Sequence, residues 1–141
     1  FLNNVHLTLW HNDKRVAAAT PSGWGANVSI SKSVNEHWIP FLRLGYAKDA
    51  GTLLERSLSA GFAYQTVTGG NQLGVAYNYG VPNKSSWGSG LDDQHTLEVF
   101  YRIQLWKEFA ITPDIQYIRN PALNPNDNNL WVFGLRGRFA F

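Results

Sequence analysis

A set of charged and polar side chains recurs at alternate positions of extended runs and could donate and accept hydrogen bonds. The set is Arg43, Glu98, Arg102, Asp114, Gln116, Arg136 and Arg138, together with the aromatic Trp10. Guanidinium groups donate paired hydrogen bonds, and carboxylate and amide oxygens accept them. These residue types therefore indicate contact with polar groups or water along one face of a sheet.

Groupings that would support catalysis or metal binding are missing from the sequence. The four histidines lack paired metal-ligand spacing, no serine lies in a GxSxG motif, and the chain has no cysteine. The segment 124–129, NPNDNN, resembles a calcium-binding loop only in composition. We therefore expect no enzymatic activity, no bound metal and no cofactor.

The composition fits one ordinary domain and argues against a nucleic-acid partner. The 141 residues include 12 basic and 10 acidic side chains, for a net charge of +2, which is too even a balance for a nucleic-acid-binding surface. No apolar run approaches the roughly 18 residues of a membrane-spanning helix. A membrane role stays open, because barrel strands hide their hydrophobicity in alternation.

Alternation of apolar and polar residues predicts an all-β chain of about eight antiparallel strands, with no convincing helix. The predicted strands are residues 3–11, 23–33, 37–47, 57–67, 71–81, 95–106, 109–119 and 129–141. In the last one, Trp131, Phe133 and Leu135 share a face, and Arg136 and Arg138 lie on the other. Pro113 interrupts this pattern and predicts a bulge or bend.

The connections between these strands alternate in length. Long ones are predicted at Asn12–Ser22, Lys48–Arg56, Pro82–Gln94 and Asn120–Asn128, and tight ones near Val34–Glu36, Thr68–Gly70 and Lys107–Glu108. All long loops therefore fall at one end of the sheet, as in outer-membrane barrels. A water-soluble up-and-down barrel, such as a lipocalin, is the alternative, but it seldom keeps this alternation.

Aromatic residues are predicted at both ends of the apolar face. Trp38, Phe109, Phe139 and Phe141 lie near the tight turns, and Tyr46, Tyr79, Tyr117 and Trp131 lie near the long loops. Two aromatic belts separated by aliphatic residues match the two interfaces of a bilayer. The pattern predicts an antiparallel transmembrane β-barrel of the bacterial outer membrane.

Over nearly its whole length, and most specifically in its second half, the chain resembles the C-terminal part of the carbohydrate-selective porins, the OprB-like family of Gram-negative outer membranes. The matching elements are Glu98-x-Phe100-Tyr101-Arg102, Thr112-Pro113-Asp114-x-Gln116 and Asn120-Pro121 within residues 92–125, with FLRLGY at Phe41–Tyr46 and GLR at Gly134–Arg136. Leu9-Trp10-His11 and Ala60-Gly61 resemble the family more loosely.

This resemblance implies a barrel of about sixteen strands that lets sugars diffuse passively across the outer membrane. Residues 1–141 are then expected to form the C-terminal portion of a single porin domain, without its N-terminal portion. The expected partners are outer-membrane lipid, small sugars, and the barrel assembly machinery, which would read Phe139 and Phe141. A homo-oligomer is left open.

The predicted inward face has an excess of positive charge. Arg43, Arg102, Arg136 and Arg138 oppose Glu98 and Asp114. Unpaired charges would be desolvated inside a closed eight-stranded barrel but stay hydrated in a wider one. In such a pore the arginines could donate to sugar hydroxyls, Glu98, Asp114 and Gln116 could accept, and inward Trp10 or Trp106 could stack on a pyranose.

The same sequence features fit other interpretations. Each arginine could instead form an ordinary wall ion pair, such as Arg102 with Glu98. The whole protein could be a general or anion-preferring porin, or a small eight-stranded membrane anchor or adhesin without a channel.

Overall fold

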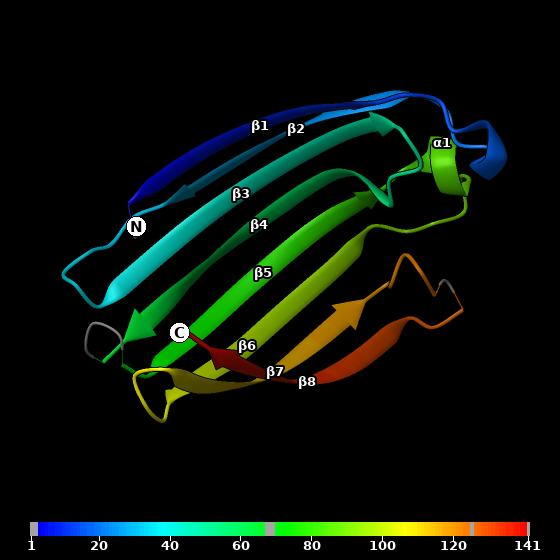
Figure 1. Cartoon of the computed structure of the whole chain (residues 1–141). Helices are drawn as coiled ribbons and strands as arrows, with labels where there is room; N and C mark the ends of the chain where they lie inside the picture. The colour runs from blue at the N-terminus through cyan, green and yellow to red at the C-terminus, as the bar shows by residue number, and fades with distance from the viewer. Residues whose placement is uncertain (1–2, 67–69, 125, 141) are drawn as a thin grey trace.

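The computed structural model of the chain describes residues 3–66, 70–124 and 126–140. Within them, eight β-strands form a single sheet (Figure 1). The strands are β1 (Asn4–Asn12), β2 (Gly23–Ser31), β3 (Trp38–Asp49), β4 (Leu54–Gln65), β5 (Gln72–Pro82), β6 (Gln94–Gln104), β7 (Phe109–Arg119) and β8 (Asn129–Phe139). Their lengths of 9 to 12 residues suit tilted strands that cross a bilayer. The predicted all-β fold is confirmed.

Each strand pairs antiparallel with its neighbour in sequence, so the order in the sheet runs from β1 to β8. The sheet curls into a trough, and Figure 1 looks onto its concave face. Among the described strands, β1 and β8 are edges and do not pair with each other. The described sheet is therefore a curved wall and not a closed eight-stranded ring.

The connections lie alternately at two ends of the sheet, as predicted. The long-loop end has residues 13–22, 50–53, 83–93 and 120–128, and the tight-turn end has residues 32–37, 66–71 and 105–108. The long loop predicted at Lys48–Arg56 is wrong, because β3 and β4 extend into it. The chain turns there through Asp49, Ala50 and Gly51, all with positive φ. The predicted turn Thr68–Gly70 falls largely on residues 67–69, outside the described ones.

Two short helical segments at the long-loop end were not predicted: a 3₁₀ turn at Val16–Ala18 and α1 (Lys84–Trp87). Before α1, the fully buried Asn83 donates from Nδ2 to Oγ1 of Thr52 at 2.9 Å. A segment of one turn is too short to show helical periodicity, which is why sequence patterning misses it. Among the described residues, no helix is long and apolar enough to cross a membrane.

Pro113 lies inside β7 without the predicted bulge. It faces Leu135 of β8 in regular register, and the register between β6 and β7 is the same on both sides of it. Pairing is interrupted opposite Tyr101 and Arg102, where proline supplies no N–H. The predicted bulge is wrong, because the sheet accommodates the missing donor as a gap in the ladder.

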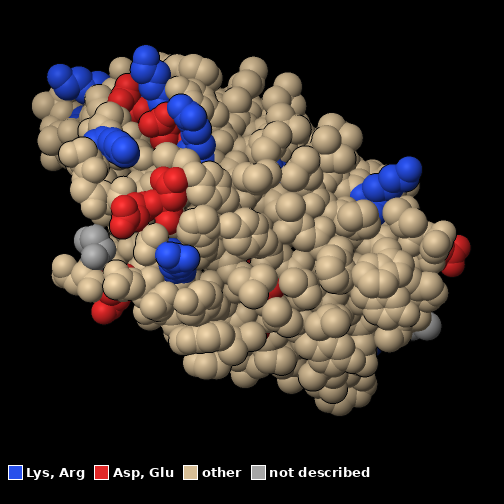
Figure 2. Space-filling view, turned by 180° about the vertical axis from the view of Figure 1, so that it is seen from behind, with Lys and Arg blue, Asp and Glu red and all other residues tan. Residues whose placement is uncertain are grey.

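The convex face of the sheet is apolar. One row across it joins Val75, Val99, Ile115 and Phe133 on four neighbouring strands. Phe133 is 76% exposed in the described sheet. Figure 2 shows this face, with almost no charged atoms across its middle. Such an apolar band is the surface that a barrel presents to hydrocarbon.

Aromatic side chains gather at both ends of the convex face, as the sequence predicts. Ring centroids of neighbouring pairs lie 4.4 to 5.4 Å apart. The pairs are Trp38–Phe62, Trp38–Tyr64 and Phe109–Phe139 at the tight-turn end, and Trp24–Tyr46, Tyr79–His95 and Tyr117–Trp131 at the long-loop end. Phe141 lies outside the described residues.

On the concave face, three aromatic rings lie over glycines of the neighbouring strand. The pairs are Trp10 on Gly25, Phe41 on Gly61 and Phe100 on Gly74. A Cβ at Gly74 would lie 2.1 Å from the Phe100 ring, so any side chain there would displace the ring. These glycines let large rings lie along the wall.

Replacing Gly74 with Ala is expected to destabilise the folded protein by about 1–3 kcal/mol, because the added methyl overpacks against Phe100. The measurement is denaturant-induced unfolding of the protein in detergent. The matched control is Gly90→Ala, since a Cβ at Gly90 meets no atom within 4 Å. Equal stability of the two variants would contradict this packing.

Candidate functional site

A cleft of about 240 Å³ opens on the concave face between β5 and β8. Its lining residues are Gln72, Glu98, Phe100, Arg102, Ala110, Thr112, Asp114, Arg136 and Arg138. We call it the arginine cleft. It brings together five of the predicted site residues, which are Glu98, Arg102, Asp114, Arg136 and Arg138.

Regular antiparallel pairing positions the side chains of the cleft. Alternation along β6 places Glu98 and Arg102 on the same face. Across the ladder, Arg136 of β8 is opposite Thr112 of β7, and Arg138 is opposite Ala110. Ala110 is only 2% exposed and has a single methyl group. Its small size leaves space under the arginines.

The cleft holds three arginines and two carboxylates, so its positive charges exceed its negative ones. Within the described part of the chain, no guanidinium of Arg102, Arg136 or Arg138 lies within 4.0 Å of a carboxylate. The alternative ion pair between Arg102 and Glu98 is therefore not formed. The net positive charge of the cleft is not cancelled by direct pairing.

Arg102 is held by a neighbour on its own strand. Its Nη2 donates to Oε1 of Gln104, two residues along the same face. Its Nε is buried and has no hydrogen-bond partner among the described residues. The guanidinium is thus oriented by one contact and keeps unused donor capacity.

The acceptors of the cleft form a group on β6 and β7. Glu98 is directly opposite Gln116, whose Nε2 donates to Oδ1 of Asp114 at 3.3 Å. Asp114 lies across Gly134 of β8, where a Cβ would come within 2.2 Å of its Oδ2. Gln116 therefore adjoins the cleft although it does not line it, and Gly134 makes room for the Asp114 carboxylate.

Sequence reasoning missed Phe100, Thr112 and Gln72 in the lining. Phe100 has the inward parity of Glu98 and Arg102, but an aromatic residue on a polar face carries no signal by itself. The available signal is Gly74, which the register places opposite Phe100. Recognising it requires the strand register, which alternation alone does not fix.

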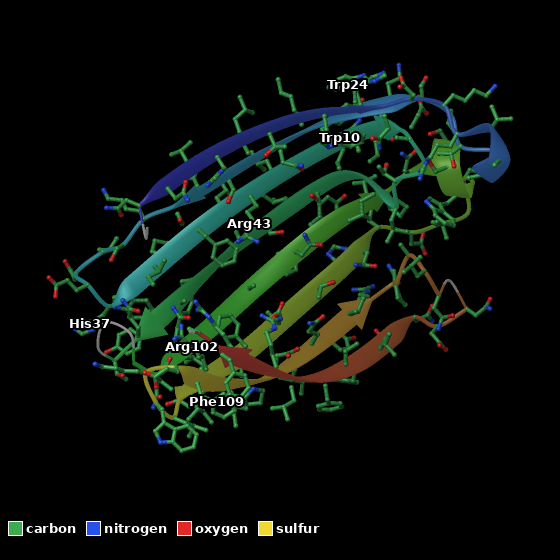
Figure 3. All side chains as sticks on the ribbon, in the orientation of Figure 1. Trp10, Trp24, His37, Arg43, Arg102 and Phe109 are labelled. Atoms are coloured by element: carbon green, nitrogen blue, oxygen red, sulfur yellow. The ribbon has the colours of Figure 1, made fainter. Side chains whose placement is uncertain are left out.

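Arg43 lies apart from the arginine cleft, on β3 (Figure 3). Its Cζ is 5.3 Å from the centroid of the Phe41 ring, a cation–π distance. It is opposite Ser29 on one side and Ser59 on the other. The structure therefore places this predicted site residue on the concave face but not with the other arginines.

Trp10 lines a second cavity, of about 170 Å³, together with Asn27, Glu55 and Ser57 among others. This cavity is formed by β1 to β4 and shares no residue with the arginine cleft. The alternative inward aromatic, Trp106, was predicted wrongly. It lies in the turn after β6 and stacks on Phe109 of the convex face at 5.8 Å, because β6 ends at Gln104.

The two residues predicted as an assembly signal lie at the end of β8. Phe139 stacks on Phe109 at 4.4 Å on the convex face. Phe141 is outside the described residues. The geometry thus places Phe139 at the tight-turn end of the apolar surface.

One apolar face, one polar face with a charged cleft, and aromatic belts at both strand ends define the wall of an outer-membrane β-barrel channel. The chain belongs to the OprB family of carbohydrate-selective porins, because the family model described as "Carbohydrate-selective porin, OprB family" matches residues 2–141. The predicted resemblance is confirmed. Proteins of this family are transport channels of Gram-negative outer membranes, surrounded by lipid and permeable to sugars. No curated protein and no solved structure gives a significant match.

The unpaired arginines predict the ion preference of the channel. Replacing Arg136 and Arg138 with Gln is expected to lower the anion-to-cation permeability ratio about twofold per arginine, as expected for a charge several ångströms away in water. The ratio is obtained from the reversal potential of the purified protein in a planar bilayer with a KCl gradient. Lys32→Gln, at the tight-turn end, is the control and should leave the ratio unchanged. A double variant with the wild-type ratio would place these arginines outside the ion path.

Proposed function

We propose that this porin lets carbohydrates diffuse passively and with weak selectivity through a water-filled pore, and that the arginine cleft is a sugar contact site on its wall. The observation that carries the proposal is the cleft itself, where donors, acceptors and an aromatic ring converge on the concave face. Arg43 and Trp10 would provide further contacts along the same wall.

The side chains of the cleft have the chemistry that a sugar needs. Arginine can donate two parallel hydrogen bonds to neighbouring hydroxyls. Glu98 and Asp114 can accept from other hydroxyls, with Gln116 beside them. The Phe100 ring lies over Gly74, which has no side chain to displace it. This apolar ring could contact the C–H face of a pyranose.

Weak selectivity follows from the exposure of these groups. Arg136 and Arg138 are exposed to solvent in the described sheet, so each contact with a hydroxyl replaces a contact with water and the net gain is small. Conduction requires sites that a solute leaves as readily as it enters. The cleft suits transient contact and not tight binding.

We also propose that this wall is part of a wider barrel, as one portion of a single porin domain. Unpaired backbone groups at the edges of β1 and β8 would be costly in hydrocarbon. Pairing with further strands would satisfy them and enlarge the lumen, in which the arginines stay hydrated. The open edges argue against the small closed anchor, which would require β1 to pair with β8.

A general or anion-preferring porin is the second candidate, favoured because the cleft arginines form no ion pair within the described part of the chain. Assembly is a separate part of the proposal: the barrel assembly machinery would recognise Phe139 and Phe141. Self-association into a homo-oligomer stays a prediction.

The test of sugar selectivity is permeation into liposomes that contain the full porin purified from its native membrane. Arg102→Ala and Arg136→Ala should each lower the rate for a monosaccharide about 2- to 10-fold relative to a zwitterionic solute of similar size, which is the effect of losing one hydrogen bond. The control is Arg119→Ala, on the convex side. If both cleft variants keep the wild-type ratio of monosaccharide to zwitterion permeation, Arg102 and Arg136 do not contact the sugar. If, in addition, both solutes pass equally fast, the result favours a general porin.

A further inference from the structure

The basic side chains that the described strands place on the convex face share one location. They are His11, Lys48, Arg56, His95 and Arg119, and each is at the long-loop end of its strand. We call them the basic rim. Among the described residues, no Asp or Glu pairs in the register at a convex position. Figure 2 shows Lys and Arg gathered at the left, at the long-loop end, with Asp and Glu side chains among them.

Register places the members of the rim beside aromatic residues or each other. Lys48 is directly opposite Trp24, and Arg56 is opposite Tyr46. Arg119 is opposite His95. Trp24 and Tyr46 are in ring contact at 5.4 Å, so cations and aromatic rings alternate along this edge of the apolar face.

Arg56 lies on the convex side in regular register with Leu58 and Ala60, and a bulge in β4 lies just before it. Leu54 pairs with Pro82 and Arg56 pairs with Val81, so the register shifts at the residue between them. That residue, Glu55, lines the Trp10 cavity of the concave side. Without this shift, Arg56 and Leu54 would share a face.

The positive charge of the rim is largely free. Lys48 and Arg119 have no ion-pair partner within 4.0 Å in the described part of the chain. Arg56 contacts Glu55 at 3.4 Å, but its side chain is 69% exposed. His11 lies 3.7 Å from Asp13, and Asp93, another acidic residue at this end, accepts a hydrogen bond from the Tyr79 hydroxyl.

At the tight-turn end the strands place aromatic residues on the convex face, and the lysines there, Lys32 and Lys107, lie in the turns between strands. Trp38 and Tyr64 pair there, as do Phe109 and Phe139. Both ends thus carry an aromatic belt, and among the described strands Lys and Arg occupy convex positions only at the long-loop end. This asymmetry across the apolar band points to two membrane interfaces with different headgroup charge.

We propose that the basic rim binds the phosphate of anionic lipid headgroups in the leaflet that surrounds the long-loop end. Lys48, Arg56 and Arg119 supply charge, His11 and His95 supply ring nitrogens, and the adjoining apolar face contacts the acyl chains. Charge complementarity at the edge of a hydrocarbon-facing surface commits the site to a membrane lipid. The proposal depends on membrane placement of the barrel and not on the solute that passes through it.

The test compares two lipids with identical brominated acyl chains, phosphatidic acid and phosphatidylcholine, as quenchers of tryptophan fluorescence in vesicles containing the full porin. Phosphatidic acid should bind at least about tenfold more tightly, and the preference should weaken at high salt. The variant Lys48→Gln/Arg56→Gln/Arg119→Gln should lose most of it. The control Lys32→Gln/Lys107→Gln, at the tight-turn end, should keep it.

Three results would overturn the proposal: no preference in the wild type, an equal loss in the control variant, or displacement of the lipid by millimolar inorganic phosphate. The last result would mean that the rim binds soluble phosphate. If the triple variant does not fold, Arg119→Gln alone should reduce the preference measurably. Sugar permeation of each folded variant should stay at the wild-type rate, so failure here leaves the sugar proposal untouched.

Discussion

The structure depends on two properties of each strand: its backbone pairs with the neighbouring strands, and its side chains point alternately to an apolar face and to a polar face. In hydrocarbon, each backbone N–H and C=O must be satisfied by another strand. Because successive side chains point to opposite faces, this ladder separates an apolar surface from a polar one without further devices. The row from Val75 to Phe133 and the group formed by Glu98, Arg102 and Arg136 are products of the same register. Everything proposed for transport and for lipid contact follows from it.

Glycine and aromatic residues shape the polar surface. The ring of Phe100 lies over Gly74 and that of Phe41 lies over Gly61. These rings therefore lie along the wall and do not project into the lumen. Arg43 lies near Phe41, whereas the arginines of the cleft form no ion pair with any described carboxylate. The wall therefore combines flat apolar patches with free donors, a surface suited to solutes that have both C–H faces and hydroxyl groups.

Alternation in the sequence was enough to predict the eight strands, their two faces and the two aromatic belts, because period-two patterning is a local property. It could not place Phe100 in the cleft or separate Arg43 and Trp10 from it, since those relations depend on register between strands. It also failed where the backbone departs from regularity. The turn through Asp49, Ala50 and Gly51 shortened an expected loop, and Pro113 left only a gap in the ladder.

The most direct test of a wet concave face and a lipid-covered convex face is cysteine accessibility along β6, because the chain has no cysteine of its own. Single cysteines at Glu98 and Arg102, and at Leu97 and Val99, would be treated with a charged, membrane-impermeant thiol reagent in reconstituted porin. A wet concave face predicts rapid modification at Glu98 and Arg102, with a change in conductance, and a lipid-covered convex face predicts protection at Leu97 and Val99. Equal reactivity on both faces, or the reverse pattern, would contradict this assignment of the two faces.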